Sequence, residues 1–117
     1  MKLGAGELLR MLADPTRLRS LVLLLEEGEL CVCELTHALG EIQPKISRHL
    51  ATLRDAQVVL DQRVGQWVFY RINPELPDWA ANILTATREA MKQDRQHLAD
   101  VRKLKSMRGR PEYRACA

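Results

Sequence analysis

The sequence has no long hydrophobic run, which bears first on membrane association. Its longest stretch of large apolar residues, Leu21 to Leu25, spans five residues, whereas a membrane-spanning helix needs about 20. Near the N-terminus, Glu7, Arg10 and Asp14 interrupt the apolar core that a secretion signal requires, and no small-residue cleavage site follows. We therefore expect a cytoplasmic protein with no membrane partner.

The usual motifs of catalysis are also missing. No glycine-rich loop is suited to hold a phosphate, and no pair of cysteines has the two-residue spacing of thiol oxidoreductases. No nucleophile, base and orienting acid form a convincing set. An enzyme is therefore not expected.

Cysteine is scarce, with Cys31, Cys33 and Cys116 as the three in 117 residues. Three cysteines cannot all pair within one chain, and two that are separated by one residue are geometrically poor disulfide partners. In a reducing compartment they are expected as thiols or as ligands, and thiolates prefer soft metals and metalloids.

The overall composition is that of one globular domain. Hydrophobic residues make up 46% and charged residues 28% of the chain, an ordinary balance for a folded protein of this length. The net charge of +3 is unevenly distributed, with −2 in residues 1–40, +2 in residues 41–72 and +3 in residues 73–117. Basic residues begin to prevail near Gln43.

Two amphipathic helices are predicted at the start of the chain. The first, around Leu8 to Leu12, ends at Asp14 because the following proline disfavours helical geometry in the residue before it. Asp14 can cap the second helix, and Pro15 suits its first position. Apolar residues then recur at helical spacing up to Leu25.

A helix-turn-helix is predicted next. Apolar residues at steps of three and four indicate a short helix from Cys31 to Leu39, and Gly40 suits its left-handed end. A second helix begins at Gln43, with Ile46, Leu50 and Leu53 on its buried side. Two short helices joined by a glycine-containing turn are typical of this motif.

The hydrophobic pattern then changes to that of strands. Residues 58–60 and 67–70 are β-rich and flank a segment containing Gly65, which predicts a β-hairpin. From about Leu76 to Met107 we expect one long helix, whose apolar stripe exceeds what the small core can cover and therefore requires a partner helix.

The predicted fold class is mainly α with a small β-hairpin (α+β): a winged helix-turn-helix that dimerises through its terminal helices. Residues 1–108 are expected to form the DNA-binding and dimerisation domain, and residues 109–117 a flexible C-terminal tail.

The outer face of the helix that starts at Gln43 predicts double-stranded DNA as a partner. Arginine can bind guanine through two hydrogen bonds, and lysine and hydroxyl groups reach phosphates or base edges. His49 lies nearer the buried boundary, and Arg63 on the hairpin is suited to the DNA backbone or minor groove. The predicted DNA contacts are Gln43, Lys45, Ser47, Arg48, His49, Thr52 and Arg63.

Two segments carry a resemblance to a known family. Glu29-Leu30-Cys31-Val32-Cys33-Glu34-Leu35, followed by Gln43-Pro44-Lys45-Ile46-Ser47-Arg48-His49-Leu50, resembles the arsenical-resistance repressors of the ArsR/SmtB family of metalloregulatory winged-helix repressors. The similarity extends from about residue 7 to residue 72. The resemblance implies a homodimeric repressor that binds operator DNA and is released when trivalent arsenic or antimony binds cysteine thiolates.

The expected inducer ligands are Cys31 and Cys33, with Cys116 as a candidate third ligand. Residues two apart on a helix point about 200° apart, so ligation is predicted to unwind or distort the start of that helix. The best-known family members carry another cysteine where this chain has Thr36. A site with two thiols suits methylarsenite, and both arsenite and methylarsenite remain open.

Three alternative functions remain. Asp94, His97 and Asp100 share a helix face and could serve a repressor that senses zinc or cadmium, although a solvated face is the favoured interpretation. A thiol-redox-sensing repressor of the same fold is the second alternative. A cysteine-based metal-carrier protein belongs to a different class, and it would need neither the DNA-facing helix nor the hairpin.

Overall fold

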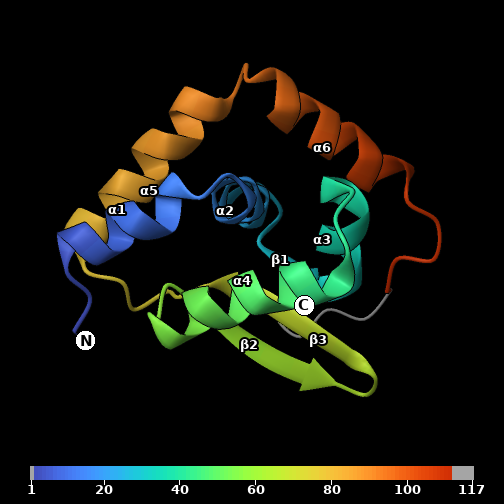
Figure 1. The fold of residues 1–117 in the computed structure, drawn as a ribbon, viewed down its shortest axis with the longest axis horizontal. Helices are drawn as coiled ribbons and strands as arrows, with labels where there is room; N and C mark the ends of the chain where they lie inside the picture. Colours follow the sequence, from blue (N-terminus) through green and yellow to red (C-terminus); the bar gives the residue numbers. More distant parts are fainter. Residues whose placement is uncertain (1, 112–117) are drawn as a thin grey trace.

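The structure, a computed structural model, describes residues 2–111 and folds them into six helices and one three-stranded sheet (Figure 1). The elements are, in chain order, α1 (Ala5–Ala13), α2 (Pro15–Glu27), β1 (Glu29–Cys31), α3 (Val32–Leu39), α4 (Gln43–Asp55), β2 (Val59–Val64), β3 (Trp67–Ile72), α5 (Asp78–Met91) and α6 (Arg95–Ser106). The fold is a winged helix-turn-helix, as predicted.

Helix α2 is the centre of the core, and Figure 1 shows it nearly end-on in the middle of the molecule. Leu21, Leu23 and Leu24 are fully buried, and α1, α4, α5 and α6 all pack against this helix. The predicted start of α2 is confirmed. The Asp14 carboxylate accepts hydrogen bonds from the backbone amides of Thr16 and Arg17, at 2.9 and 3.0 Å.

The helix-turn-helix is confirmed as well. Helix α3 ends at Gly40, whose φ of 67° is left-handed and favours glycine. The buried side of α4 is the predicted one, since Ile46, Leu50 and Leu53 are fully inaccessible. This packing fixes which side of α4 faces outward.

The wing has one strand more than predicted. Strands β2 and β3 form the expected antiparallel hairpin, which turns at Gly65. Strand β1 adds to the other edge of β3, with Cys31 opposite Phe69, so that the order is β1-β3-β2. A three-residue strand has too few residues to show a period of two, and its partner lies about 40 residues away in sequence.

The prediction of one long C-terminal helix is wrong. Helix α5 begins after Pro77, and the chain turns after Met91 before α6 starts. The Asp94 carboxylate caps α6 by accepting a hydrogen bond from the His97 amide at 3.0 Å. The turn lets α6 pack on α3 and α2, where Leu104 is fully buried. Leu104 of the α6 stripe is thus covered by its own chain, whereas Leu98 is 38% exposed.

None of the helices within residues 2–111 is both long and apolar enough to cross a membrane.

Candidate nucleic-acid interface and thiol site

The side of α4 opposite its buried leucines carries most of the predicted DNA contacts. Gln43 and Arg48 are exposed, whereas Lys45, Ser47 and Thr52 are half-buried. The Lys45 ammonium lies 3.1 Å from a carboxylate oxygen of Glu41, one turn earlier, and the Thr52 hydroxyl donates to the Arg48 carbonyl at 3.1 Å. Of the two cations among these predicted contacts, Arg48 is thus the exposed one.

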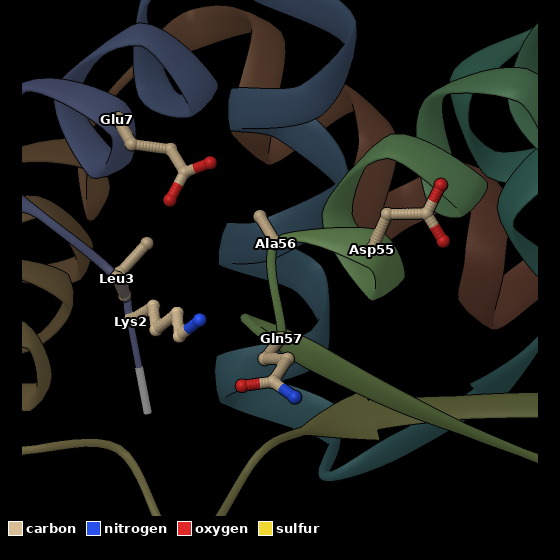
Figure 2. Close-up of a pocket in the computed structure, with 6 residues that line it drawn as sticks. All are labelled: Lys2, Leu3, Glu7, Asp55, Ala56 and Gln57. Atoms are coloured by element: carbon tan, nitrogen blue, oxygen red, sulfur yellow. The ribbon is translucent and has the colours of Figure 1, made fainter.

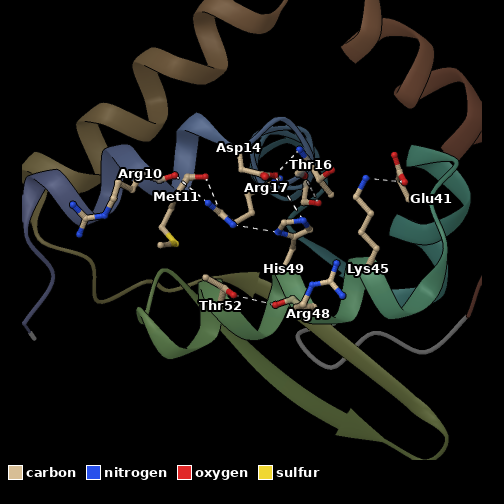
Figure 3. A network of polar contacts seen from close by, with 11 residues as sticks. Arg10, Met11, Asp14, Thr16, Arg17, Glu41, Lys45, Arg48, His49 and Thr52 are labelled. Atoms are coloured by element: carbon tan, nitrogen blue, oxygen red, sulfur yellow. Dashed lines mark hydrogen bonds and ion pairs between the residues drawn. The ribbon is translucent and has the colours of Figure 1, made fainter.

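His49 occupies a different side of α4, where it faces the junction of α1 and α2 (Figure 3). Its Nδ1 lies 3.2 Å from an Nη of Arg17, and its Nε2 lies 3.8 Å from the Asp14 carboxylate. Arg17 also donates to the backbone carbonyls of Arg10 and Met11, at 3.1 Å each. The assignment of His49 to the DNA contacts stays a prediction, and in this structure its ring contacts Arg17 and Asp14 between α4 and α2.

Two pKa values in this network are shifted downward. Desolvation lowers the pKa of His49, and the cations Arg17, Arg48 and Lys45 lower it further against the opposing attraction of Asp14. Partial burial opposes ionisation of Asp14, but backbone hydrogen bonds and the charges of His49 and Arg17 bring the pKa of its carboxyl below the usual value. His49 is therefore neutral and Asp14 ionised near pH 7.

Arg63 lies on the outer part of the wing. It is exposed on β2 and pairs in register with Val68, close to the turn at Gly65. Figure 1 shows the β2–β3 hairpin, which carries this residue, beside α4.

The two closely spaced cysteines meet at the start of α3. Cys31 is the last residue of β1 and the N-cap of α3, with an extended backbone at φ −84° and ψ 163°. Cys33 lies in the first turn of the helix, and the two sulfurs are joined in a disulfide across a Cα to Cα distance of 5.4 Å. Two predictions are thereby corrected. The pair can form a disulfide, and the sulfurs meet without unwinding α3, because Cys31 lies outside the helix.

Cys31 also closes a capping box. Its sulfur accepts a hydrogen bond from the Glu34 amide at 3.4 Å, and its own amide donates to the Glu34 carboxylate at 2.9 Å. Arg110, after the end of α6, forms an ion pair with the same buried carboxylate and lies 3.6 Å from Glu27. Part of the predicted flexible tail is thus held against the thiol site.

Sequence reasoning missed Glu34 and Arg110, although the spacing of Cys31 and Glu34 is that of a capping box with cysteine in place of serine. No local pattern links Arg110 to Glu34, since 76 residues separate them.

A groove of about 550 Å³ opens beside the cysteines, between the start of α3, the first turns of α4 and the wing. Among the residues that the structure describes, its walls hold two sulfurs and an apolar surface from the wing, and they include no lysine, arginine, aspartate or glutamate. The lining residues are Cys31, Val32, Cys33, Thr36, His37, Gln43, Ser47, Gln66, Trp67, Val68 and Tyr70.

The face of α6 with Asp94, His97 and Asp100 was considered as a possible zinc site. His97 and Asp100 are instead buried and bind residues of α2. His97 lies 2.9 Å from the Glu26 carboxylate, and Asp100 binds the Arg19 guanidinium at 2.8 and 2.9 Å. Both His97 and Asp100 are nearly inaccessible, at 3% and 1% exposure, so the interpretation as a solvated face is wrong. Within residues 2–111, no three His, Cys, Asp or Glu residues are arranged to hold a metal ion.

Cys116, the predicted third ligand of the inducer, lies outside the described residues.

A second hollow, of about 460 Å³, lies between the N-terminal segment and the end of α4 (Figure 2). Its walls carry Lys2, Glu7, Asp55 and Gln57 but no cysteine or histidine. It has none of the soft ligands that the first groove offers.

Comparisons with known proteins agree with this arrangement. The family described as "Bacterial regulatory protein, arsR family" matches residues 14–60. The chain is 52% identical over 106 residues to the arsenic resistance transcriptional regulator ArsR2 of Pseudomonas putida, covering 90% of each protein. It is 55% identical over 78 residues to the arsenical resistance operon repressor of Escherichia coli, covering 67% of each.

Solved structures show the same fold. The antimony-specific transcriptional repressor AntR matches with a TM-score of 0.60 and 33% identity over 76% of this chain and 84% of that one. Reduced HlyU from Vibrio cholerae matches with a TM-score of 0.67 and 31% identity over 76% and 90%. The chain belongs to the arsR family of bacterial regulatory proteins.

Proposed function

We propose that this protein is a transcriptional repressor that binds operator DNA through α4 and the wing and is released by trivalent arsenic or antimony. The observation that carries the proposal is the meeting of two sulfurs at the N-terminus of α3, the helix that directly precedes the DNA-facing helix. The names of the relatives support the same class of inducer.

The donor set fits such a ligand when the cysteines are reduced. Thiolates are soft ligands that select soft metals and metalloids. The Cα atoms of the two cysteines lie 5.4 Å apart, so both side chains can reach one atom. The described lining of the groove holds no lysine, arginine, aspartate or glutamate, which suits a neutral species such as arsenite in its trihydroxide form.

On the DNA side, we assign base reading chiefly to Arg48 and Ser47. Gln43, Lys45 and Thr52 are assigned to phosphate or base-edge contacts, and Arg63 to the backbone or minor groove. The exposure of Arg48 and Arg63 supports their assignment.

Cys31 couples ligand binding to the wing and to α4, the parts proposed to face DNA. This residue ends β1, which pairs with wing strand β3, and it caps α3, which leads through Gly40 into α4. A ligand on its sulfur competes with the capping hydrogen bond from Glu34 and alters the start of α3. The ligand then has different interaction energies with the DNA-competent and released forms, which any switch requires.

Cys116 remains the candidate for a third sulfur. Pro111, the last described residue, is buried, and Arg110 beside it pairs with Glu34 at the thiol site. Cys116 follows five residues later, and an extended chain of that length spans about 17 Å.

The active form is proposed to be a homodimer that uses α1 and α5. Leu9 on α1 is 54% exposed and Trp79 on α5 is 38% exposed, which leaves large apolar side chains without cover on these two helices. A two-fold dimer presents two copies of α4 to a roughly palindromic operator with half-sites about one helical turn, or a multiple, apart.

Titration of the operator complex tests this function. The reduced protein, bound to its upstream DNA, is treated separately with arsenite, methylarsenite, antimonite, zinc and cadmium. Release by the arsenicals or antimonite at concentrations where zinc and cadmium have no effect is expected. Release by zinc or cadmium alone contradicts the proposal.

A second candidate function is thiol-redox sensing, which the Cys31–Cys33 disulfide favours. Peroxide can oxidise the two thiols to this disulfide while it is itself reduced to water. If oxidation is the natural signal, peroxide releases the DNA and a thiol reductant restores binding. An arsenical sensor instead responds under fully reducing conditions.

A further inference from the structure

The groove beside the cysteines has more space and more apolar surface than inorganic arsenite needs. Its volume of about 550 Å³ lies in the usual range for small-molecule sites. Trp67 and Val68 form its wing wall, and Val32 adds an apolar side chain from α3.

We infer that this groove is a subsite for the organic substituent of a trivalent organoarsenical, which binds through Cys31 and Cys33 with its carbon group against Trp67 and Val68. This inference rests on the proposed function and specifies the class of inducer. The ligand it points to has one arsenic–carbon bond and two exchangeable hydroxyl groups, and its substituent is as large as a phenyl ring.

The count of sulfurs agrees with this ligand. The described part of the chain places two cysteines in the groove, and Thr36 also lines it. A trivalent arsenic bound to two sulfurs has one remaining position, and a carbon substituent fills it permanently. The reaction is an exchange without oxidation, in which two arsenic–oxygen bonds break and two arsenic–sulfur bonds form. Each hydroxyl group leaves as water with a thiol proton.

The character of the walls agrees as well. Since none of the lining residues in the range 2–111 is a lysine, arginine, aspartate or glutamate, a neutral organoarsenical meets no such charged group of this range on entry. Burial of an aromatic substituent against Trp67 gains both apolar contact and ring stacking. Inorganic arsenite has no group that can use this surface.

The position of the subsite also links it to the DNA-facing residues. Gln43 and Ser47 of α4 and Gln66 of the wing line the same groove. A bulky substituent therefore lies between the two elements that are proposed to hold DNA, and it can interfere with both directly.

The test measures binding of arsenite, methylarsenite and phenylarsenite to reduced protein without DNA, with calorimetry as the readout and a phosphine as the reductant. In the wild type, phenylarsenite is expected to bind at least about tenfold more tightly than arsenite. Trp67→Ala is expected to reduce this preference severalfold, and Trp67→Phe to retain most of it. Thr36→Phe, which fills the groove from α3, is expected to reduce it independently if Trp67→Ala fails to fold.

Equal affinity of the wild type for arsenite and phenylarsenite would overturn the inference while leaving the proposed function intact. A preference for phenylarsenite that neither Trp67→Ala nor Thr36→Phe reduces would overturn it too. If none of the three arsenicals binds the wild type, the proposed function itself fails, and the inference fails with it.

Discussion

At the scale of single residues, Arg48 and Lys45 differ in their surroundings on α4. Arg48 is exposed, whereas the Lys45 ammonium lies 3.1 Å from Glu41. Arg48→Ala should weaken operator binding by about 1–3 kcal/mol and relax sequence preference, because a base contact is lost. Lys45→Ala should weaken binding to all sequences alike and make its salt dependence less steep.

Fluorescence anisotropy with operator and scrambled DNA at several salt concentrations measures both effects. Arg102→Ala, which removes an exposed arginine of α6, is the matched control. Unchanged affinity and specificity in both α4 variants would contradict the assignment of these residues to DNA.

The lowered pKa of His49 predicts how stability depends on pH. In the unfolded chain the imidazole has its ordinary pKa of 6.5, and in the folded protein the pKa of His49 is lower. The unfolded state thus binds more protons in this range, so the free energy of unfolding should fall as pH falls from about 7 through 6.5. Arg17, Arg48 and Lys45 all disfavour the charged ring.

Urea unfolding at pH 7 and pH 5.5, at constant protein concentration, measures this loss. The His49→Gln variant should lose less stability between the two pH values than the wild type does. His37→Gln changes an exposed histidine of α3 and serves as the control. If His49→Gln and the wild type lose the same stability, the lowered pKa of His49, caused chiefly by its desolvation, does not govern this dependence.

At the scale of elements, α6 is attached to the core by a buried ion pair. The Arg19 guanidinium of α2 binds both carboxylate oxygens of Asp100 and also donates to the carbonyl of Leu39 at the end of α3. Arg19→Ala leaves the Asp100 carboxylate, 1% exposed, without its cation. The variant should therefore lose about 3 kcal/mol of unfolding free energy.

Chemical denaturation measures this loss. The double variant Arg19→Met with Asp100→Leu should recover most of it, because an apolar pair leaves no buried charge unpaired. A loss below about 1 kcal/mol in Arg19→Ala would show that α6 does not depend on this pair.

Elements with local signals were predictable from sequence. The start of α2 follows from Asp14 and Pro15, and the buried side of α4 follows from the spacing of Ile46 and Leu50. The division between α5 and α6 was missed because no proline or glycine interrupts residues 78–107. The new helix begins instead at Asp94, whose carboxylate caps α6. Hydrophobic period alone cannot show that a helix stops and turns back.

The site was predictable in its residues but less so in its geometry. The spacing of Cys31 and Cys33 pointed to a shared ligand, yet the helical geometry assumed for them placed their sulfurs apart. The difference arises because Cys31 has the extended backbone of an N-cap, and strand β1 that positions it forms only against distant β3. Pairing between distant strands such as β1 and β3 produces no periodic pattern in the sequence, so it could not be predicted from that pattern.

At the scale of the whole molecule, the exposed apolar residues of α1 and α5 predict the oligomeric state. Sedimentation of the wild type at micromolar concentration should give a dimer with twice the chain mass of 13.4 kDa. Trp79→Glu should shift the equilibrium toward monomer, because a charge cannot be buried in an apolar interface without a partner.

Leu98→Glu is the matched control for this change, since Leu98 on α6 is also 38% exposed. It should leave the dimer intact. A stable wild-type monomer, or equal dissociation of both variants, would contradict an interface formed by α1 and α5.

The central claim concerns the whole molecule as a switch: a ligand on Cys31 and Cys33 releases DNA that is held elsewhere, on α4 and the wing. Cys31→Ser and Cys33→Ser keep the DNA-facing residues, and serine is itself a good helix N-cap in place of Cys31. Both variants should therefore fold and bind the operator with wild-type affinity.

The most direct measurement is the release of labelled operator DNA from the reduced wild type and the two serine variants as methylarsenite or arsenite is added. Cys116→Ser is included to learn whether arsenite needs a third sulfur; in that case it loses the arsenite response and keeps the methylarsenite response. The account predicts release from the wild type and none from Cys31→Ser or Cys33→Ser at the same concentrations. Release from either variant at the wild-type concentration would contradict the paired-thiol switch.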